Sequence, residues 1–278
     1  MVSLLEKLGR AADSRLVILV SDGLGSSNAA NQAVAESLRH GLATSAAVQV
    51  PCPWASGAAA NHRGEDVGVS LTFNAPFDVY RWGPITQAPS LLGGNGGFPA
   101  TVADLWDHAD PHELRREARA QIERAILWGF DPSFLDAHLH AISSRPEFFD
   151  VYLELAIDFQ LPITLPDPSV ELGFPARELA AAEGVLCADR AVSTNASDKP
   201  LAALSQALVN AEPGVTEIHL APAFDTEEIR SLDPSWPRRV SDAHAMISDL
   251  VFKAQIERSD VELIGFTALR TAQRKDER

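Results

Sequence analysis

Cysteine and basic residues are scarce in this sequence. The 278-residue chain has two cysteines, Cys52 and Cys187, which lie far apart and show neither metal-type nor redox-type spacing. Two such thiols do not make a disulfide scaffold, so a reducing cytoplasm is the expected compartment. Lysine and arginine number 23 against 38 aspartate and glutamate residues, which gives a net charge of -15. A field of that sign repels phosphate backbones, so no nucleic-acid partner is expected.

The sequence also lacks a long hydrophobic run. None of its stretches approaches the roughly 20 apolar residues that span a bilayer. Glu6 and Arg10 interrupt the N-terminal segment, where a signal peptide needs an unbroken apolar core. No repeat, low-complexity tract or linker divides residues 1–278, and with 46% hydrophobic residues the chain can fill a sizeable core. We therefore expect one cytoplasmic domain with no membrane partner.

Several motifs of nucleotide binding and acyl transfer are missing as well. There is no Walker loop, no Gly-x-Ser-x-Gly elbow and no local signature of a nucleophilic cysteine. The turn at residues 23–28 follows an apolar run, as a dinucleotide-binding turn does. Asn28, however, stands where that turn needs glycine or alanine, and no acidic residue ends the next apolar run. A glycine-bearing turn between a strand and a helix is the better interpretation.

Short apolar runs alternate with longer amphipathic stretches, which is typical of βα units around a mostly parallel sheet. At this length the pattern predicts an α/β fold, either a (β/α) barrel or a doubly wound sheet. Roughly eight strands are expected from these runs. They cover residues 16–20, 46–50, 67–72, 134–138, 162–165, 185–187, 217–220 and 262–266.

Two helices and one long loop can be placed from local signals. A capping box at residues 110–113, with proline at the first helical position, opens an amphipathic helix. A second helix is expected from about Pro146, with Phe148 and Tyr152 on its buried face. Residues 76–99 are rich in proline and glycine, which predicts a loop, and long loops in compact domains are often functional.

Polar residues gather at two predicted strand ends. Asp22 follows the first strand, where α/β folds place pocket residues, so it could be a general base or a ligand. A helix N-cap is the alternative role for it. Asp136, His138 and His140 alternate along another strand, which predicts one shared face that could bind a metal or move protons. Packed polar residues are the alternative there. His219 falls inside a strand, and we interpret it as packed.

Together, these segments resemble the YdjC-like carbohydrate deacetylases, a family that includes chitooligosaccharide and hopanoid-associated deacetylases. The likeness covers nearly the whole chain, so it specifies the fold better than the chemistry. The stretches that carry it are VILVSDGLGSSNAAN at residues 17–31, SAAVQVPCPW at 45–54, VGVSLTFNAPFDVYRWGP at 67–84, the segment 135–146 and the segment 217–223.

The resemblance implies a distorted (β/α) TIM-like barrel in which one Asp and two His hold a divalent metal, Mg or Zn. That metal activates water against the N-acetyl group of an amino sugar, with an Asp as base and a late His as acid. Residue by residue, the base falls on Asp22 and the second metal-binding His on His138. The metal-binding Asp falls on Gly23, the first metal-binding His on Ser70, and the late acid on Ala221.

These departures put the metal in doubt, because a catalytic metal site normally has three protein donors and an open position for water. Glycine offers no side-chain donor and serine is a poor neutral one, so no resident cofactor is expected. Two alternatives stay open. Asp22, His138 and His140 could form a relocated metal site, or the same residues could carry out acid/base catalysis without a metal.

The expected ligand is a small carbohydrate-like molecule. Tyr80, Arg81 and Trp82 place an aromatic face beside a cationic donor, which suits a sugar, and Ser70 and Asp136 would join them in binding. We expect a homologue that is inactive in the family reaction or repurposed, and that keeps a sugar pocket. An active carbohydrate deacetylase is the alternative, and a homo-oligomer is left open.

Overall fold

A single sheet of parallel strands forms the centre of the structure, a computed structural model that describes residues 2–193, 200–209 and 211–276. Within those residues the strand order is β4-β3-β2-β1-β6-β5, with β7 beside β1, and every pairing is parallel. The strands are β1 (Arg15–Leu24), β2 (Ser45–Val48), β3 (Val67–Leu71), β4 (Leu135–Ala137), β5 (Arg190–Ser193), β6 (Gly214–Leu220) and β7 (Val261–Leu263).

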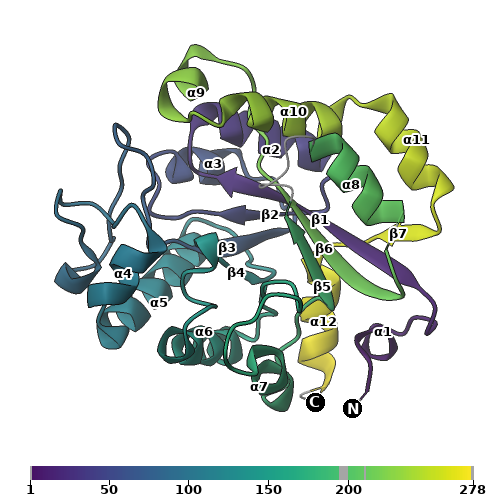
Figure 1. The fold of residues 1–278 in the computed structure, drawn as a ribbon, viewed down its shortest axis with the longest axis horizontal. Helices are drawn as coiled ribbons and strands as arrows, with labels where there is room; N and C mark the ends of the chain where they lie inside the picture. The colour runs from purple at the N-terminus through teal and green to yellow at the C-terminus, as the bar shows by residue number, and fades with distance from the viewer. Residues whose placement is uncertain (1, 194–199, 210, 277–278) are drawn as a thin grey trace.

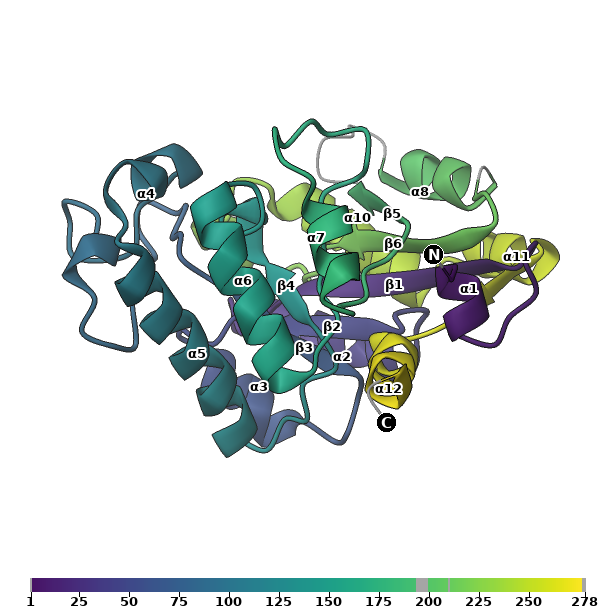
Figure 2. The same cartoon turned by 90° about the horizontal axis from the view of Figure 1, so that it is seen from below.

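Helices cover both sides of this sheet (Figures 1 and 2). α2, α8, α10 and α11 lie on one side, and α5, α6, α7 and α12 lie on the other. The helices are α1 (Leu4–Lys7), α2 (Asn28–Arg39), α3 (Ala55–Asn61), α4 (Val102–His108), α5 (Pro111–Leu127), α6 (Pro146–Phe159), α7 (Ala176–Ala182), α8 (Pro200–Val209), α9 (Glu227–Leu232), α10 (Trp236–Ile247), α11 (Leu250–Arg258) and α12 (Phe266–Asp276), with 3₁₀ turns η1 (Pro89–Leu91) and η2 (His138–His140).

The strand β1 organises the sheet. It pairs with β6 along one edge, and along the other edge with β7 in its first half and β2 in its second. Its residues from Leu16 to Val20 are almost completely buried, as expected for a central parallel strand covered on both faces. The sheet curls into a half-barrel. Its two edge strands, β4 and β5, are not paired with each other in the described part of the chain, so the barrel is not closed. This arrangement confirms the predicted α/β fold of the distorted TIM-like barrel type.

The two predicted helices are confirmed as α5 and α6. The carboxylate of Asp110 caps α5 by accepting hydrogen bonds from the backbone N–H groups of His112 and Glu113. Residues 76–99 form the predicted loop, in which η1 is the regular element. None of the helices in the described residues is long and apolar enough to cross a bilayer.

Three strand predictions are wrong. Residues 162–165 make one isolated bridge, from Ile163 to Leu135, rather than a strand. Residues 185–187 are not a strand, and the strand that follows them is β5, which was not predicted. The predicted strand 262–266 ends early because α12 begins at Phe266, whose ring stacks on Phe134 with the ring centroids 3.9 Å apart.

Candidate functional site

A cavity of about 700 Å³ opens at the carboxyl ends of the parallel strands. Asp22 reaches it from β1, Ser70 from β3, Asp136 from β4, and both Glu217 and His219 from β6. This is the edge at which α/β folds carry their binding sites. The structure therefore brings the two predicted clusters of polar residues into one pocket.

The end of β1 is irregular, and this irregularity directs Asp22. Its pairing with β2 shifts register between Ser21 and Leu24, and Gly23 has a left-handed φ of 85°. Such bulges commonly redirect a side chain next to an active site. The helix-cap role considered for Asp22 is wrong, because Ser27 is the N-cap of α2.

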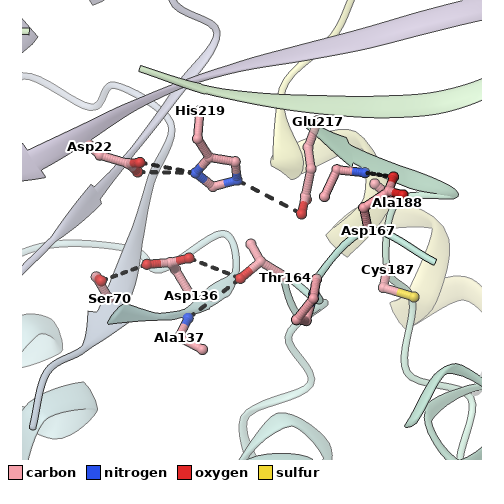
Figure 3. A network of polar contacts seen from close by, with 12 residues as sticks. Asp22, Ser70, Asp136, Ala137, Thr164, Asp167, Cys187, Ala188, Glu217 and His219 are labelled. Carbon is pink, nitrogen blue, oxygen red and sulfur yellow. Dashed lines mark hydrogen bonds and ion pairs between the residues drawn. The ribbon is translucent and has the colours of Figure 1, made fainter. Parts of the chain in front are cut away.

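Asp22, His219 and Glu217 form a continuous polar chain across β1 and β6 (Figure 3). The Nδ1 atom of His219 lies 3.2 and 3.1 Å from the two carboxylate oxygens of Asp22, and its Nε2 atom lies 3.8 Å from Oε1 of Glu217. The side chain of His219 is 14% exposed and that of Asp22 is 27% exposed. The earlier interpretation of His219 as a merely packed residue is wrong, because its ring joins two acidic groups in the cavity wall.

The protonation of Asp22, His219 and Glu217 follows from their contacts. Although burial lowers the pKa of His219, the neighbouring Asp22 and Glu217 carboxylates outweigh that effect and hold the pKa well above its usual value. Burial raises the pKa of Asp22, with the charge and hydrogen bond of His219 opposing it. Burial likewise raises the pKa of Glu217. At neutral pH, His219 is an imidazolium held against the Asp22 carboxylate.

Asp136 occupies a separate position in the β3–β4 half of the cavity (Figure 3). One of its carboxylate oxygens accepts a hydrogen bond of 2.5 Å from the hydroxyl of Ser70, and the other accepts one of 2.9 Å from the hydroxyl of Thr164. Two neutral hydroxyls thus satisfy this buried carboxylate. Ser70 stands at the position where the resemblance implies a metal-binding His, and here its hydroxyl donates to Asp136.

The shared strand face predicted for Asp136, His138 and His140 is wrong beyond Ala137, where β4 ends. The following residues form η2, in which Leu139 and His140 have left-handed φ angles of 53° and 55°. His138 Nδ1 lies 2.8 Å from Nε2 of Gln49, and burial lowers the pKa of His138 to about 4. Burial also lowers the pKa of His140. Both histidines line the cavity, but neither is the hydrogen-bond partner of Asp22.

The predicted sugar platform is only partly brought to the cavity. Trp82 lines it but is largely buried, and its indole N–H donates to the backbone oxygen of Asn74. Arg81 instead donates to the backbone oxygen of Phe98. Tyr80 packs edge-on against Trp82, and burial raises its pKa to about 12. Neither Tyr80 nor Arg81 is among the described residues that line the cavity.

Arg239 on α10 lies against Gly23 and Ala221, two positions at which the resemblance implies other residues. Its Nε donates to the backbone oxygen of Ala221 over 3.0 Å, and its Nη1 lies 3.1 Å from a carboxylate oxygen of Asp233. Its Nη2 is buried and has no hydrogen-bond partner. A Cβ atom added to Gly23 would lie 2.8 Å from that Nη2, so the guanidinium occupies the space of a side chain at residue 23.

At two of the three positions where the resemblance implies metal ligands, Gly23 and Ser70, the side chain offers no uncommitted donor to a metal. Gly23 and Ala221 have no side-chain donor, and the hydroxyl of Ser70 is engaged with Asp136. In the described part of the chain, no three His, Cys, Asp or Glu side chains are grouped closely enough to hold an ion. A relocated site formed by Asp22, His138 and His140 therefore has no support in the geometry, since metal ligands need positions accurate to about 0.2 Å.

Sequence reasoning missed several residues of the site. Glu217 and His219 line the cavity together with Ala221, and the spacing of two residues is the signal that could have found them, because alternate residues of a strand share one face. Gln49 follows a predicted strand closely enough to be suspected by the same rule that selected Asp22. Arg239 had no signal, because it lies on a helix far along the chain.

The fold and the position of the cavity define an α/β barrel protein with a polar binding site at the carboxyl ends of its strands. A sequence profile described as "YdjC-like protein" matches residues 16–258. The chain belongs to the YdjC-like family.

The chain is similar in sequence to named relatives and similar in fold to a solved structure. A carbohydrate deacetylase of Thermus thermophilus is 34% identical over 251 residues, which cover 88% of this chain and 90% of that one. A carbohydrate deacetylase of Geobacillus stearothermophilus is 32% identical over 151 residues, or 54% and 59% of the two chains. A structure from Enterococcus faecalis, named as a candidate cellobiose-phosphate cleavage protein, superposes with a TM-score of 0.80 at 23% identity, covering 92% and 99%. At that identity it shows the fold alone.

Proposed function

We propose that this protein binds a carbohydrate in the cavity and does not carry out metal-dependent deacetylation. The donor set is the observation that carries the proposal. Gly23, Ser70 and Ala221 stand where the resemblance implies a metal-binding Asp, a metal-binding His and a catalytic acid. A hydrated dication would meet His138 there as the remaining family ligand, and one imidazole does not hold it.

The cavity itself suits a sugar. Its volume of about 700 Å³ lies within the range of small-molecule sites, and it combines polar side chains with the aromatic rings of Phe77 and Trp82. Hydroxyl groups of a carbohydrate can donate to carboxylates such as Asp136, while an aromatic face packs against the apolar face of a sugar ring. Family membership supports the same ligand class, because the curated relatives are named carbohydrate deacetylases.

A second candidate function is metal-free acid/base catalysis, and the Asp22–His219 pair favours it. His219 lies two residues before Ala221 on the cavity-facing side of β6, so it is a cationic acid displaced along the same strand face. Asp22 is a partly exposed carboxylate in contact with it. Such a pair could supply one base and one acid to a bound sugar derivative.

The test combines binding with product release in metal-free buffer. N,N′-diacetylchitobiose is titrated into the protein with and without chelator, and released acetate is measured on the same samples. The proposal predicts saturable binding that the chelator leaves unchanged, and no acetate. Acetate release that stops on chelation, or absence of binding, contradicts it.

Acetate release that survives chelation would establish the second candidate instead. In that case it should be lost in both Asp22→Asn and His219→Gln. Asp225→Asn is the matched control, because that exposed carboxylate just before α9 pairs with Arg230 and does not line the cavity.

A further inference from the structure

Arg239 is held in place by the protein on two of its three nitrogen atoms. Nε is bonded to the backbone oxygen of Ala221 and Nη1 to the carboxylate of Asp233, and the side chain is 8% exposed. The guanidinium group is planar, so these two contacts fix the direction of the third nitrogen as well. Nη2 therefore cannot turn away to find an acceptor elsewhere.

The position of Nη2 is the second part of the observation. Both Gly23 and Arg239 line the cavity, and Nη2 faces the space that a side chain at residue 23 would fill. A buried donor without a partner is unfavourable, and native structures rarely leave one unless a ligand or water satisfies it. We propose that Arg239 is the specificity-determining residue of this cavity: its guanidinium replaces the lost metal site and donates from Nη2 to an uncharged carbonyl oxygen of the bound carbohydrate.

The charges around the cavity indicate that this acceptor is uncharged. Among the described lining residues, each cation already has a carboxylate partner: Arg239 has Asp233, Arg238 has Asp242, and His219 has Asp22. Asp136 and Glu217 add further acidic groups. A carboxylate or phosphate ligand would enter beside these acids without an uncommitted cation to receive it.

An amide carbonyl meets both requirements. It is a strong neutral acceptor, and a bond to a charged guanidinium is stronger than one between two neutral groups. Among common sugar substituents, the acetamido group carries such an oxygen, whereas a hydroxyl or an ammonium group does not. This inference rests on the proposed function, since it concerns the ligand of the same cavity.

The test uses three β-1,4-linked disaccharides that differ only at C2. N,N′-diacetylchitobiose carries acetamido groups, chitobiose carries ammonium groups and cellobiose carries hydroxyls. Calorimetric titrations in chelator should show the acetamido disaccharide binding about tenfold more tightly than cellobiose, the scale of one hydrogen bond to a charged donor. In Arg239→Lys the ratio of the two affinities should fall to about one. Lysine keeps the positive charge beside Asp233 but has no second, fixed N–H donor equivalent to Nη2.

A second variant guards against misfolding of the first. Gly23→Asp keeps the arginine but puts a Cβ atom 2.8 Å from Nη2, which forces the guanidinium out of its position, so the acetamido preference should also disappear. Asp tolerates left-handed backbone better than most residues. Arg230→Lys is the control, because that exposed arginine lies on α9 outside the cavity and should keep the wild-type preference.

The outcomes separate the two proposals. If the wild type binds all three disaccharides equally, or if Arg239→Lys and Gly23→Asp keep the preference, the role of Arg239 is wrong while carbohydrate binding stands. Tighter binding of cellobiuronic acid than of the acetamido disaccharide overturns the uncharged acceptor. If no disaccharide binds the wild type, both proposals fail.

Discussion

The two halves of the cavity satisfy their acidic groups in different ways. In the β1–β6 half, Asp22 is paired with a charged imidazolium, that of His219. In the β3–β4 half, Asp136 is paired with the neutral hydroxyls of Ser70 and Thr164, and the nearby His138 is uncharged at neutral pH. The implied metal of the family would join these halves, because its ligands come from β1, β3 and the end of β4.

Under the proposed function, the two halves of the cavity do not share an ion. Asp22 and Asp136 each have hydrogen-bond partners from their own half, and Arg239 lies against Gly23 and Ala221. Substitutions in the two halves should therefore differ in size and act almost independently.

The largest expected effect comes from the charged half. His219→Ala leaves Asp22 and Glu217 facing each other without a cation, which should lower the free energy of unfolding at pH 7 by about 3 kcal/mol. Urea unfolding at pH 7 measures this loss. His244→Ala, an exposed histidine on α10, should change stability by less than about 0.5 kcal/mol. Equal losses of unfolding free energy in His219→Ala and His244→Ala would show that the β1–β6 half does not depend on a charged pair.

The pH dependence of stability sharpens the same contrast. The folded-state pKa of His219 lies well above its ordinary value because of Asp22 and Glu217, with Asp136 and His140 as the other ionisable groups nearby. The stabilising contribution is complete below about pH 6.5 and is lost as the pH rises through the folded-state pKa, at up to about 1.4 kcal/mol per pH unit.

Urea unfolding between pH 6 and 10 checks this slope. In His219→Gln the contribution should be absent, so the difference between wild type and variant should narrow as the pH rises. Parallel curves for the two proteins would show that His219 is not charged in the folded state.

A smaller effect is expected in the neutral half. Ser70→Ala removes one of two hydroxyl donors to Asp136, which should cost about 1 kcal/mol. Combined with His219→Ala, the two losses should add to within about 0.5 kcal/mol, since no hydrogen bond between described residues joins the halves and Ser70→Ala leaves the Asp136 carboxylate in place. A larger coupling energy in this double-mutant cycle would mean that the halves still act as one site.

The smallest effect concerns metal. Ser70→His restores the implied first metal-binding histidine, but it provides no carboxylate at Gly23, and the guanidinium of Arg239 stays beside that position. Thermal unfolding with zinc and with chelator should therefore give the same midpoint for this variant, as for the wild type. A zinc-dependent rise of the midpoint in either protein would revive the metal site.

Much of the fold could be predicted because its signals are local. The cap at Asp110 and the apolar spacing of α5 and α6 depend on neighbouring residues, and β1 contains the apolar run of residues 16–20. Strand prediction failed where backbone hydrogen bonding, rather than an apolar pattern, determines whether a strand forms. Pro162 has no N–H for a ladder, so its segment makes a single bridge, and the short β5 carries little apolar pattern of its own.

In the site, too, the features set by local sequence could be predicted and the long-range contacts could not. The position of Asp22 follows from the rule that strand ends carry polar site residues. Its partner does not, because the contact with His219 joins residues that are 197 positions apart. Arg239 depends on how α10 packs over the barrel mouth. The alternation assumed for His138 and His140 failed because the strand stops at Ala137.

The two left-handed residues of η2 have a consequence for how the cavity rim could be redesigned. Leu139 and His140 are both non-glycine residues with positive φ, a conformation that costs on the order of 1 kcal/mol for each. Glycine would relieve that strain at either position, yet Leu139 instead keeps a half-exposed apolar side chain at the cavity edge. A glycine substitution at this rim would thus raise thermal stability but, at Leu139, would remove a hydrophobic contact surface from the cavity edge. The two properties can be adjusted separately, one residue at a time.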